Sequence, residues 1–423
     1  MPVFTSSIEV TADYPTIKPS LNLNFARSRS LDPRITFTRA SVGTYVGRDG
    51  LIKTAGVDEA RFDHDPDTLE SLGLLIEESR TNIVNNNSNV GSWNNASTSQ
   101  ETANPIKGLY THRVIDVGND GDSPWLSGSN YTTGTVTMSM YIDAVNSTSD
   151  TVTMYLFGGG YISTTWTLTT GVPIHNGGFS INGVNHSNGR VQTIDCGGGI
   201  YRLVLTADYS GGTTASRFYI TPSNTDTGYV IVAGMQMEQG SFPTSYIPTA
   251  GSAVTRSADV ASITGTNFSS WYNPTEVSVI GEYSSAQYQG NLTPASYPSP
   301  FAIDNNSTTR LVMFYHRYDN QLNAFVRSGA GDSVADLNIY SPATSLDYSN
   351  IKFGFATSND GLSGIVNDGN IVTDATVNMP LDVNRVVIGG GYGANPFAIC
   401  GSVKYLRFYT KKLSDTQLQQ LIQ

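Results

Sequence analysis

Short runs in which apolar and polar residues alternate with a period of two fill much of the chain from about residue 100 onward. Clear examples are residues 135–141, 151–157, 201–207 and 216–220. Because successive side chains of a strand point to opposite faces, these runs predict strands with one buried face. Their shortness and the Gly-rich turns between them are typical of an antiparallel sandwich or jelly roll.

A second series of alternating runs starts near residue 257 and includes residues 277–281, 311–315 and 351–355. Asp368-Gly369 lies between two such runs and predicts a hairpin, since this pair tolerates the positive φ of a type I′ turn. Only the end of the chain has a helical pattern. Ser414 to Gln417 forms a capping box ahead of an apolar stripe, which predicts a short C-terminal helix.

The first 80 residues differ from the rest because charged residues are more than twice as dense there. Asp49-Gly50 predicts a hairpin within this segment. Its arginines alternate with acidic residues, which fits either a self-paired, solvated surface or a polar docking surface for a partner chain. Under the second interpretation, the attachment candidates are Arg27, Arg29, Arg34, Arg39 and Arg61.

These patterns predict an all-β chain in three parts. We expect an irregular, hairpin-containing N-terminal segment at residues 1–82, a jelly-roll domain at 83–250 and a second β-sandwich at 251–423, ending in the short helix. Residues 81–98 are rich in Asn and Ser and are expected to form a connecting loop. Residues 243–256 contain two prolines and no period, which predicts a linker.

Composition narrows the possible functions. Charged residues are 14% of the chain, against about 25% in a typical soluble protein, and the net charge is −11. An acidic chain with few Lys and Arg has no electrostatic footprint for nucleic acid. There is no apolar run long enough to span a membrane and no signal-peptide pattern at the N-terminus. Cys196 and Cys400 are far apart and are expected to be buried thiols rather than a disulfide.

No catalytic or metal-binding motif stands out. The sequence lacks a Walker A loop, a His-Glu-x-x-His run, a Cys-x-x-Cys pair and a Gly-x-Ser-x-Gly elbow, and its five histidines are scattered. Asp63-His64-Asp65-Pro66-Asp67 has carboxylates at alternate positions but is interpreted as a surface turn. We therefore expect a non-enzymatic protein without a metal or cofactor.

Aromatic residues within Gly-, Asn-, Ser- or Pro-rich stretches are the remaining candidates for chemistry. Aromatic faces can stack on sugar rings, and the loop ends of a sandwich are common binding places. The alternative for each ring is that it closes the end of a sandwich core. The glycan-binding candidates are Trp125, Tyr161, Trp271, Tyr318 and Tyr392.

Residues 34–82 closely resemble a segment common in bacteriophage virion proteins, through Arg39-Ala40-Ser41, Gly73-Leu74-Leu75-Ile76-Glu77 and Arg80-Thr81-Asn82. Residues 229–263 are similar to the end of the jelly-roll module that follows this segment in those proteins. Residues from about 270 to 423 resemble concanavalin A-like (laminin G-like) lectin sandwiches more weakly, without the acidic metal loop of legume lectins.

The resemblance implies a structural virion protein of a bacteriophage: a tail fibre, spike or head fibre, assembled in the bacterial cytoplasm. Its N-terminus would anchor it to other virion proteins, and its sandwiches would bind host-surface polysaccharide. A homo-oligomer is implied, with a trimer favoured. Two alternatives remain open, namely a head or tail decoration protein that binds no glycan and a polysaccharide depolymerase with paired carboxylates.

Overall fold

The computed structural model describes residues 18–87, 92–103, 105–116, 124–222, 228–286, 297–307, 310–317, 321–329, 334–340, 348–391 and 398–423. Its strands pair antiparallel in several sheets, and a short helix closes the chain. The predicted all-β fold class is therefore confirmed. The chain contacts divide into two compact units. Unit 1 combines residues up to 37 with residues 260–423, and unit 2 is residues 38–259.

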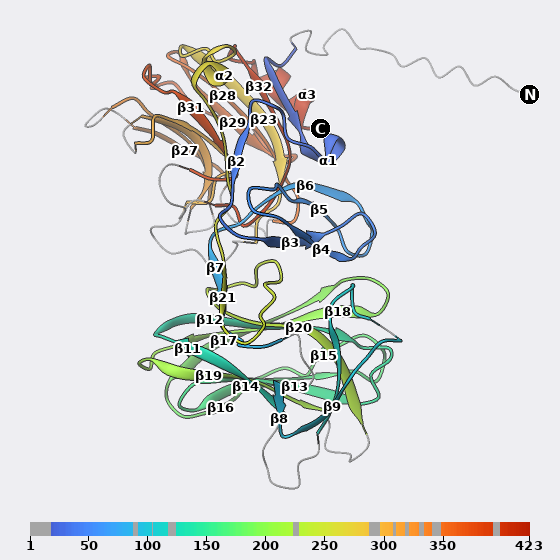
Figure 1. The fold of residues 1–423 in the computed structure, drawn as a ribbon. Helices are drawn as coiled ribbons and strands as arrows, with labels where there is room; N and C mark the ends of the chain where they lie inside the picture. The colour runs from blue at the N-terminus through green and yellow to red at the C-terminus, as the bar shows by residue number, and fades with distance from the viewer. Residues whose placement is uncertain are drawn as a thin grey trace, which may run out of the picture. The chain divides into compact units, whose positions relative to one another are not determined.

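Unit 2 contains two large sheets, seen as two layers in Figure 1. Sheet I has the order β17-β18-β12-β20-β10-β9, formed by β9 (Ala96–Gln100), β10 (Thr111–Asp116), β12 (Gly134–Asp143), β17 (His186–Asp195), β18 (Ile200–Tyr209) and β20 (Tyr229–Gln239). Sheet II has the order β15-β14-β13-β19-β11-β8, with β16 also paired to β14. Its strands are β8 (Trp93–Asn94), β11 (Trp125–Tyr131), β13 (Thr151–Phe157), β14 (Tyr161–Thr167), β15 (Ile174–His175), β16 (Ser180–Asn182) and β19 (Thr214–Pro222).

The two sheets of unit 2 enclose one apolar core. Every second residue of β12, such as Val136 and Met138, points into the core. There these side chains pack with inward-facing residues of sheet II, such as Leu156, Trp166 and Phe218, and all five are fully buried. Each such side chain contributes about 1.5–3 kcal/mol when removed from water. The period of two read from the sequence is thus the period of core-facing positions, and the predicted run 151–157 coincides with β13.

The start of unit 2 forms the short strands β3 (Gly43–Val46), β4 (Ile52–Ala55), β5 (Phe62–His64), β6 (Ser71–Ile76) and β7 (Arg80–Asn82). Strands β3 and β4 form the hairpin predicted around Asp49-Gly50, and Gly50 has the positive φ of 71° that the turn requires. Strand β7 pairs with β21 (Val254–Arg256) near the end of the unit.

Unit 1 also consists of two packed sheets. Sheet III has the order β30-β29-β28-β23-β32, with β1 also paired to β32. Its strands are β1 (Leu21–Asn24), β23 (Glu276–Tyr283), β28 (Ile351–Ser358), β29 (Gly361–Val366), β30 (Val372–Asp374) and β32 (Gly401–Tyr409). Sheet IV has the order β2-β22-β31-β24-β25-β26-β27, formed by β2 (Thr36–Thr38), β22 (Val260–Thr264), β24 (Phe301–Asp304), β25 (Leu311–His316), β26 (Leu322–Arg327), β27 (Val334–Tyr340) and β31 (Arg385–Ile388).

Stacked phenylalanines join the sheets of unit 1, with the ring centres of Phe314 and Phe353 4.6 Å apart. Helices α1 (Phe25–Ser28) and α2 (Gly265–Ser269) are short. Helix α3 (Asp415–Ile422) begins at the predicted capping box, in which Ser414 Oγ accepts from the Gln417 amide and the Gln417 side chain accepts from the Ser414 amide. Its buried Leu418 and Ile422 pack with Ile280 of β23.

The N-terminal residues of the described chain complete unit 1. Leu21 and Leu23 of β1 pair with Phe408 and Leu406 of β32, and all four are buried. The sequence predicted three segments, residues 1–82, 83–250 and 251–423. The contacts place the boundaries differently: residues 18–37 fold with the C-terminal sandwich, and residues 38–82 fold with the jelly roll.

Candidate functional site

The outer face of sheet I is covered by other parts of unit 2. Gln236 Nε2 donates to the Ser245 carbonyl at 3.3 Å, and the Thr244 amide donates to Glu238 Oε2 at 3.0 Å. Ile52 of the β3–β4 hairpin packs on the same face. Because Gln236 and Glu238 are completely buried, the part of this face over β20 has no room for a ligand.

These contacts also change the interpretation of residues 243–256, which were expected to be a linker. Thr244, Tyr246 and Ile247 are buried. The backbone of these residues is not paired with a strand, and side chains from other parts of unit 2 form hydrogen bonds with it instead. For example, Asn82 Nδ2 donates to the Ile247 carbonyl at 2.8 Å. The stretch is therefore a fixed part of unit 2 rather than a loose connection.

The outer face of sheet II has a continuous row of aromatic rings. Tyr155 and Phe157 alternate with buried residues along β13, and Tyr219 does the same along β19. Ring centres are 5.3 Å apart for Tyr161 and Tyr155, 6.4 Å for Tyr155 and Tyr219, 5.7 Å for Phe157 and Tyr219, and 6.0 Å for Tyr219 and Trp125. We call these five half-exposed residues the aromatic platform.

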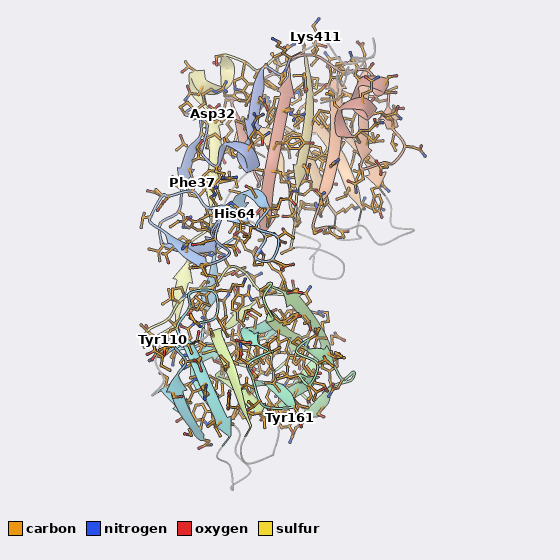
Figure 2. All side chains as sticks on the ribbon, turned by 90° about the vertical axis from the view of Figure 1, so that its right-hand side faces the viewer. Asp32, Phe37, His64, Tyr110, Tyr161 and Lys411 are labelled. Atoms are coloured by element: carbon orange, nitrogen blue, oxygen red, sulfur yellow. The ribbon has the colours of Figure 1, made fainter. Side chains whose placement is uncertain are left out.

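Strand register explains why the rings gather. Tyr219 lies opposite Trp125 on one side and Tyr155 on the other, and Phe157 lies opposite Tyr161. The platform therefore spans β11, β19, β13 and β14 in order. In Figure 2, Tyr161 and His64 lie at opposite sides of unit 2, so the platform faces away from the N-terminal part of the unit.

Arg217 lies within the platform. Its guanidinium carbon is 4.5 Å from the ring centre of Trp125 and 5.4 Å from that of Phe157, and its Nη1 donates to the Tyr219 hydroxyl at 2.8 Å. Stacking on two rings is worth about 0.5–1 kcal/mol per contact at exposed sites. These contacts orient the guanidinium while leaving it half-exposed.

The rest of this face is hydroxyl-rich. Thr153 and Thr165 lie opposite each other on β13 and β14, and their hydroxyls are 2.7 Å apart. Ser127 lies opposite Arg217. At the described outward positions of β11, β13, β14 and β19 there is no Asp or Glu. The face thus combines flat apolar rings, hydroxyl groups and one positive charge.

Two of the five predicted glycan-binding candidates, Trp125 and Tyr161, belong to the platform. Trp271 is instead 7% exposed and packs against Phe268 and Phe408 in unit 1. For this ring, the alternative interpretation, that it closes a sandwich core, therefore holds. Tyr318 and Tyr392 lie outside the described residues. Sequence reasoning missed Tyr155, Phe157, Arg217 and Tyr219, although the strand alternation around them could have revealed their common face.

The five predicted attachment arginines do not form one surface. Arg27 and Arg29 are exposed near α1, and Arg27 lines an open pocket of 510 Å³ formed by residues 22–33. Arg34 forms a bidentate pair with Asp32, at 2.8 Å for both contacts. Arg39 and Arg61 are 1% and 0% exposed in unit 2. Because both of these guanidiniums are buried, Arg39 and Arg61 are not available for a contact with a partner chain.

Arg39 and Arg61 belong to a buried ion cluster in unit 2. Arg39 Nη1 donates to Asp259 Oδ1 at 3.0 Å, and Arg61 Nη1 donates to Glu77 Oε2 at 2.7 Å. Arg61 also pairs with Asp259, and Arg256 Nε is 3.5 Å from Glu77 Oε2. Burial alone would raise the pKa of Glu77, but the charges of Arg256 and Arg61 lower it to about 2. The cluster is structural, since arginines pair with both of its carboxylates.

Within the described ranges, no group of three or more His, Cys, Asp or Glu residues is arranged to hold a metal ion. None of the described helices is both long and apolar enough to cross a membrane. Cys196 and Cys400 are both buried, in different units.

No family model and no curated protein matches the chain. Among solved structures, it is similar to the CBM40 of a Ruminococcus gnavus IT-sialidase, with 15% identity and a TM-score of 0.31 over 37% of this chain and 87% of that one. It is also similar to domains LG4-5 of the mouse laminin α1 chain, with 10% identity and a TM-score of 0.26 over 81% and 92% of the two chains. A Trypanosoma rangeli sialidase matches with 8% identity and a TM-score of 0.27 over 74% and 66%.

Proposed function

We propose that this chain is a non-enzymatic virion protein of a bacteriophage, a tail fibre, spike or head fibre, that binds host-surface glycans through the aromatic platform. It would be assembled in the bacterial cytoplasm and reside in the virion. Its partners would be other virion proteins and the host polysaccharide, and copies of the chain would associate with each other, a trimer being favoured. The proposal requires no cofactor or nucleic acid.

The aromatic platform carries the glycan part of the proposal. Five rings lie side by side on a sheet face that no other described part of unit 2 covers, and a protein does not usually leave that much aromatic surface in water without a use. The C–H face of a sugar ring is apolar and flat, and its hydroxyls need hydrogen-bond partners. Ser127, Thr153 and Thr165 place such partners beside the rings.

The same face supports binding rather than cleavage. Hydrolysis of a glycosidic bond generally uses two carboxylates about 5–10 Å apart. The outward positions described for β11, β13, β14 and β19 have none, and the platform is a row of rings along a sheet face. A single weak site of this kind gains strength when several copies on one particle bind the same polymer.

The virion part of the proposal rests on the resemblance of residues 34–82 and 229–263 to phage virion proteins. Contacts between these two segments support treating them as one module. Thr44 Oγ1 donates to the Tyr246 carbonyl at 2.5 Å, and Arg39 pairs with Asp259. A module shared among virion proteins would be expected to keep such internal contacts.

Two experiments test the two parts separately. The full-length chain is applied to an array of purified bacterial envelope polysaccharides, and binding to at least one class is expected. Binding to none of them would contradict the glycan part. Peptides of the chain are then sought by mass spectrometry in purified phage particles. Particles that lack the chain would contradict the virion part.

A decoration protein without glycan binding remains the second candidate, because edge strands of sheet II expose aliphatic side chains. Ile174 of β15 and Ile181 of β16 are each 53% exposed, and Val184 beyond β16 is 92% exposed. Such residues can form a contact with another virion chain. The variant Ile181→Ser/Val184→Ser would then reduce incorporation into particles, whereas the variant Trp125→Ala would leave incorporation unchanged.

A further inference from the structure

We propose that the aromatic platform binds an anionic saccharide and that Arg217 is the residue that selects it, by pairing with an oxyanion of the sugar. This inference rests on the proposed glycan-binding function and names the substrate class of that site. It begins from a contrast in charge. The chain has a net charge of −11, yet the described outward positions of the four platform strands carry one arginine and no carboxylate.

Arg217 differs from the two other described arginines of unit 2 that are half-exposed, since each of those has a carboxylate partner. Arg113 of β10 also stacks on an aromatic ring, that of Tyr229 at 4.2 Å, but it pairs with Glu101 at 2.7 Å. Arg190 of β17 lies 3.6 Å from Asp208. Among the described residues, the hydrogen-bond partner of the Arg217 guanidinium is a neutral hydroxyl, that of Tyr219. Within the part of the chain that the structure describes, its positive charge is therefore not neutralised by a neighbouring carboxylate.

The contacts of Arg217 hold it ready for a ligand. Trp125 and Phe157 contact the guanidinium from two strands, and the Tyr219 hydroxyl fixes one of its nitrogens. A guanidinium has five N–H groups in a rigid fork, which fits carboxylate or phosphate oxygens better than it fits single hydroxyls. Because stacking has already restricted this side chain, less conformational entropy is lost when an anion binds.

The position of Arg217 relative to the rings fits a charged sugar better than a free anion. Arg217 lies opposite Phe157 on β13, and the Trp125 ring of β11 on its other side is 4.5 Å from its guanidinium carbon, so rings lie on both sides of it. A sugar stacked on either side would carry its acidic substituent to the guanidinium. A neutral glycan would use the rings but leave the charge unpaired, and a free anion would use the charge but not the rings.

The test compares matched polysaccharides on the full-length chain. Polygalacturonate and its fully methyl-esterified form differ in the carboxylate, and phosphomannan and mannan differ in the phosphate. Biolayer interferometry measures the wild type, the variant Arg217→Gln and the control Arg190→Gln, which removes the same charge from another half-exposed arginine of unit 2. Thermal melting verifies that all three are folded.

We expect the wild type to bind one of the acidic polymers at least about tenfold more tightly than its neutral twin, since a charge-assisted hydrogen bond contributes about 1.5–3 kcal/mol. Arg217→Gln should remove this preference, because it should weaken binding of the acidic polymer far more than binding of its neutral twin, and Arg190→Gln should keep the preference. The polymer that shows the preference identifies carboxylate or phosphate as the ligand. Two results would overturn this inference while leaving the proposed glycan binding intact. One is that the wild type binds the acidic and the neutral polymer of each pair with equal affinity. The other is that Arg217→Gln weakens binding to the acidic and the neutral polymer by the same factor. If the chain binds neither these polymers nor any on the envelope array, the proposed function fails with it.

Discussion

Arg39 and Asp259 form a fully buried ion pair, with Arg39 Nη1 3.0 Å from Asp259 Oδ1, although 220 positions separate them in the sequence. They lie at the two ends of unit 2, which is residues 38–259. Asp259 also pairs with Arg61 and accepts from the Glu77 amide at 2.9 Å. The pair therefore closes the unit where the chain enters and leaves it.

Removal of Asp259 should destabilise unit 2 strongly. In the variant Asp259→Ala, the buried guanidiniums of Arg39 and Arg61 lose a shared partner, and breaking such a pair costs about 3–5 kcal/mol. Urea denaturation followed by tryptophan fluorescence measures the change. The control is Asp382→Ala, which removes an exposed partner of Arg310 in unit 1 and should leave the stability of unit 2 unchanged. Equal stability of wild type and Asp259→Ala would contradict a structural role for the cluster.

Glu77 should make unit 2 sensitive to acid. Burial raises its pKa, but Arg256 and Arg61 lower it from 4.5 to about 2 in the folded state. Because the folded state holds this proton less tightly than the unfolded state, Glu77 stabilises the fold above pH 4.5, and this contribution is lost as the pH falls toward 2. Its size is about 3 kcal/mol.

The variant Glu77→Gln tests this dependence. It should be less stable than the wild type at pH 7, and its stability should fall less steeply between pH 4.5 and pH 2. Denaturation midpoints measured at several pH values give both curves. Parallel curves for the two proteins would mean that the acid sensitivity comes from other groups.

The C-terminal sandwich should require the N-terminal strands. Leu21, Leu23 and Phe25 are 1–2% exposed in unit 1, and burying each contributes about 1.5–3 kcal/mol. Residues 260–423 alone should therefore be unstable or aggregate. Without β1, the backbone edge of β32 and the apolar surface that Leu21, Leu23 and Phe25 cover would be exposed to water. A chain that joins residues 18–37 to residues 260–423 through a short Gly-Ser linker should fold. Circular dichroism melts distinguish the two, and equal cooperative unfolding of both would show that β1 and β2 are dispensable.

The sequence predicted local features well. Alternation located β13 to the residue, and the capping box at Ser414 located the start of α3. The hairpin at Asp368-Gly369 shows a limit of such signals. The residue with positive φ there is Asn367, at 47°, because the turn bond joins the Gly369 amide to the Val366 carbonyl and places Asn367 at the turn's first central position.

Contacts between residues far apart in the chain could not be predicted from the sequence. Arg39 and Arg61 lie in a charge-dense stretch and were expected at a surface, but their partner Asp259 is contributed from the far end of unit 2. The platform is a similar case. Trp125 and Tyr161 could be singled out by their neighbours, whereas the register that brings Tyr219 between Trp125 and Tyr155 exists only in the folded sheet.

Loss of rings from the platform tests the account's central claim most directly. The binding of full-length chain to purified host envelope polysaccharide is measured for the wild type, for Trp125→Ala/Tyr219→Ala and for the control Tyr110→Ala, which removes a half-exposed ring elsewhere in unit 2. Each lost ring contact should cost about 1 kcal/mol, so the double variant should bind about tenfold or more weakly. Its melting temperature should change little, because neither ring is in the sandwich core, and Tyr110→Ala should bind as the wild type does. Wild-type binding by a folded double variant would contradict the claim that this platform is the glycan-binding surface.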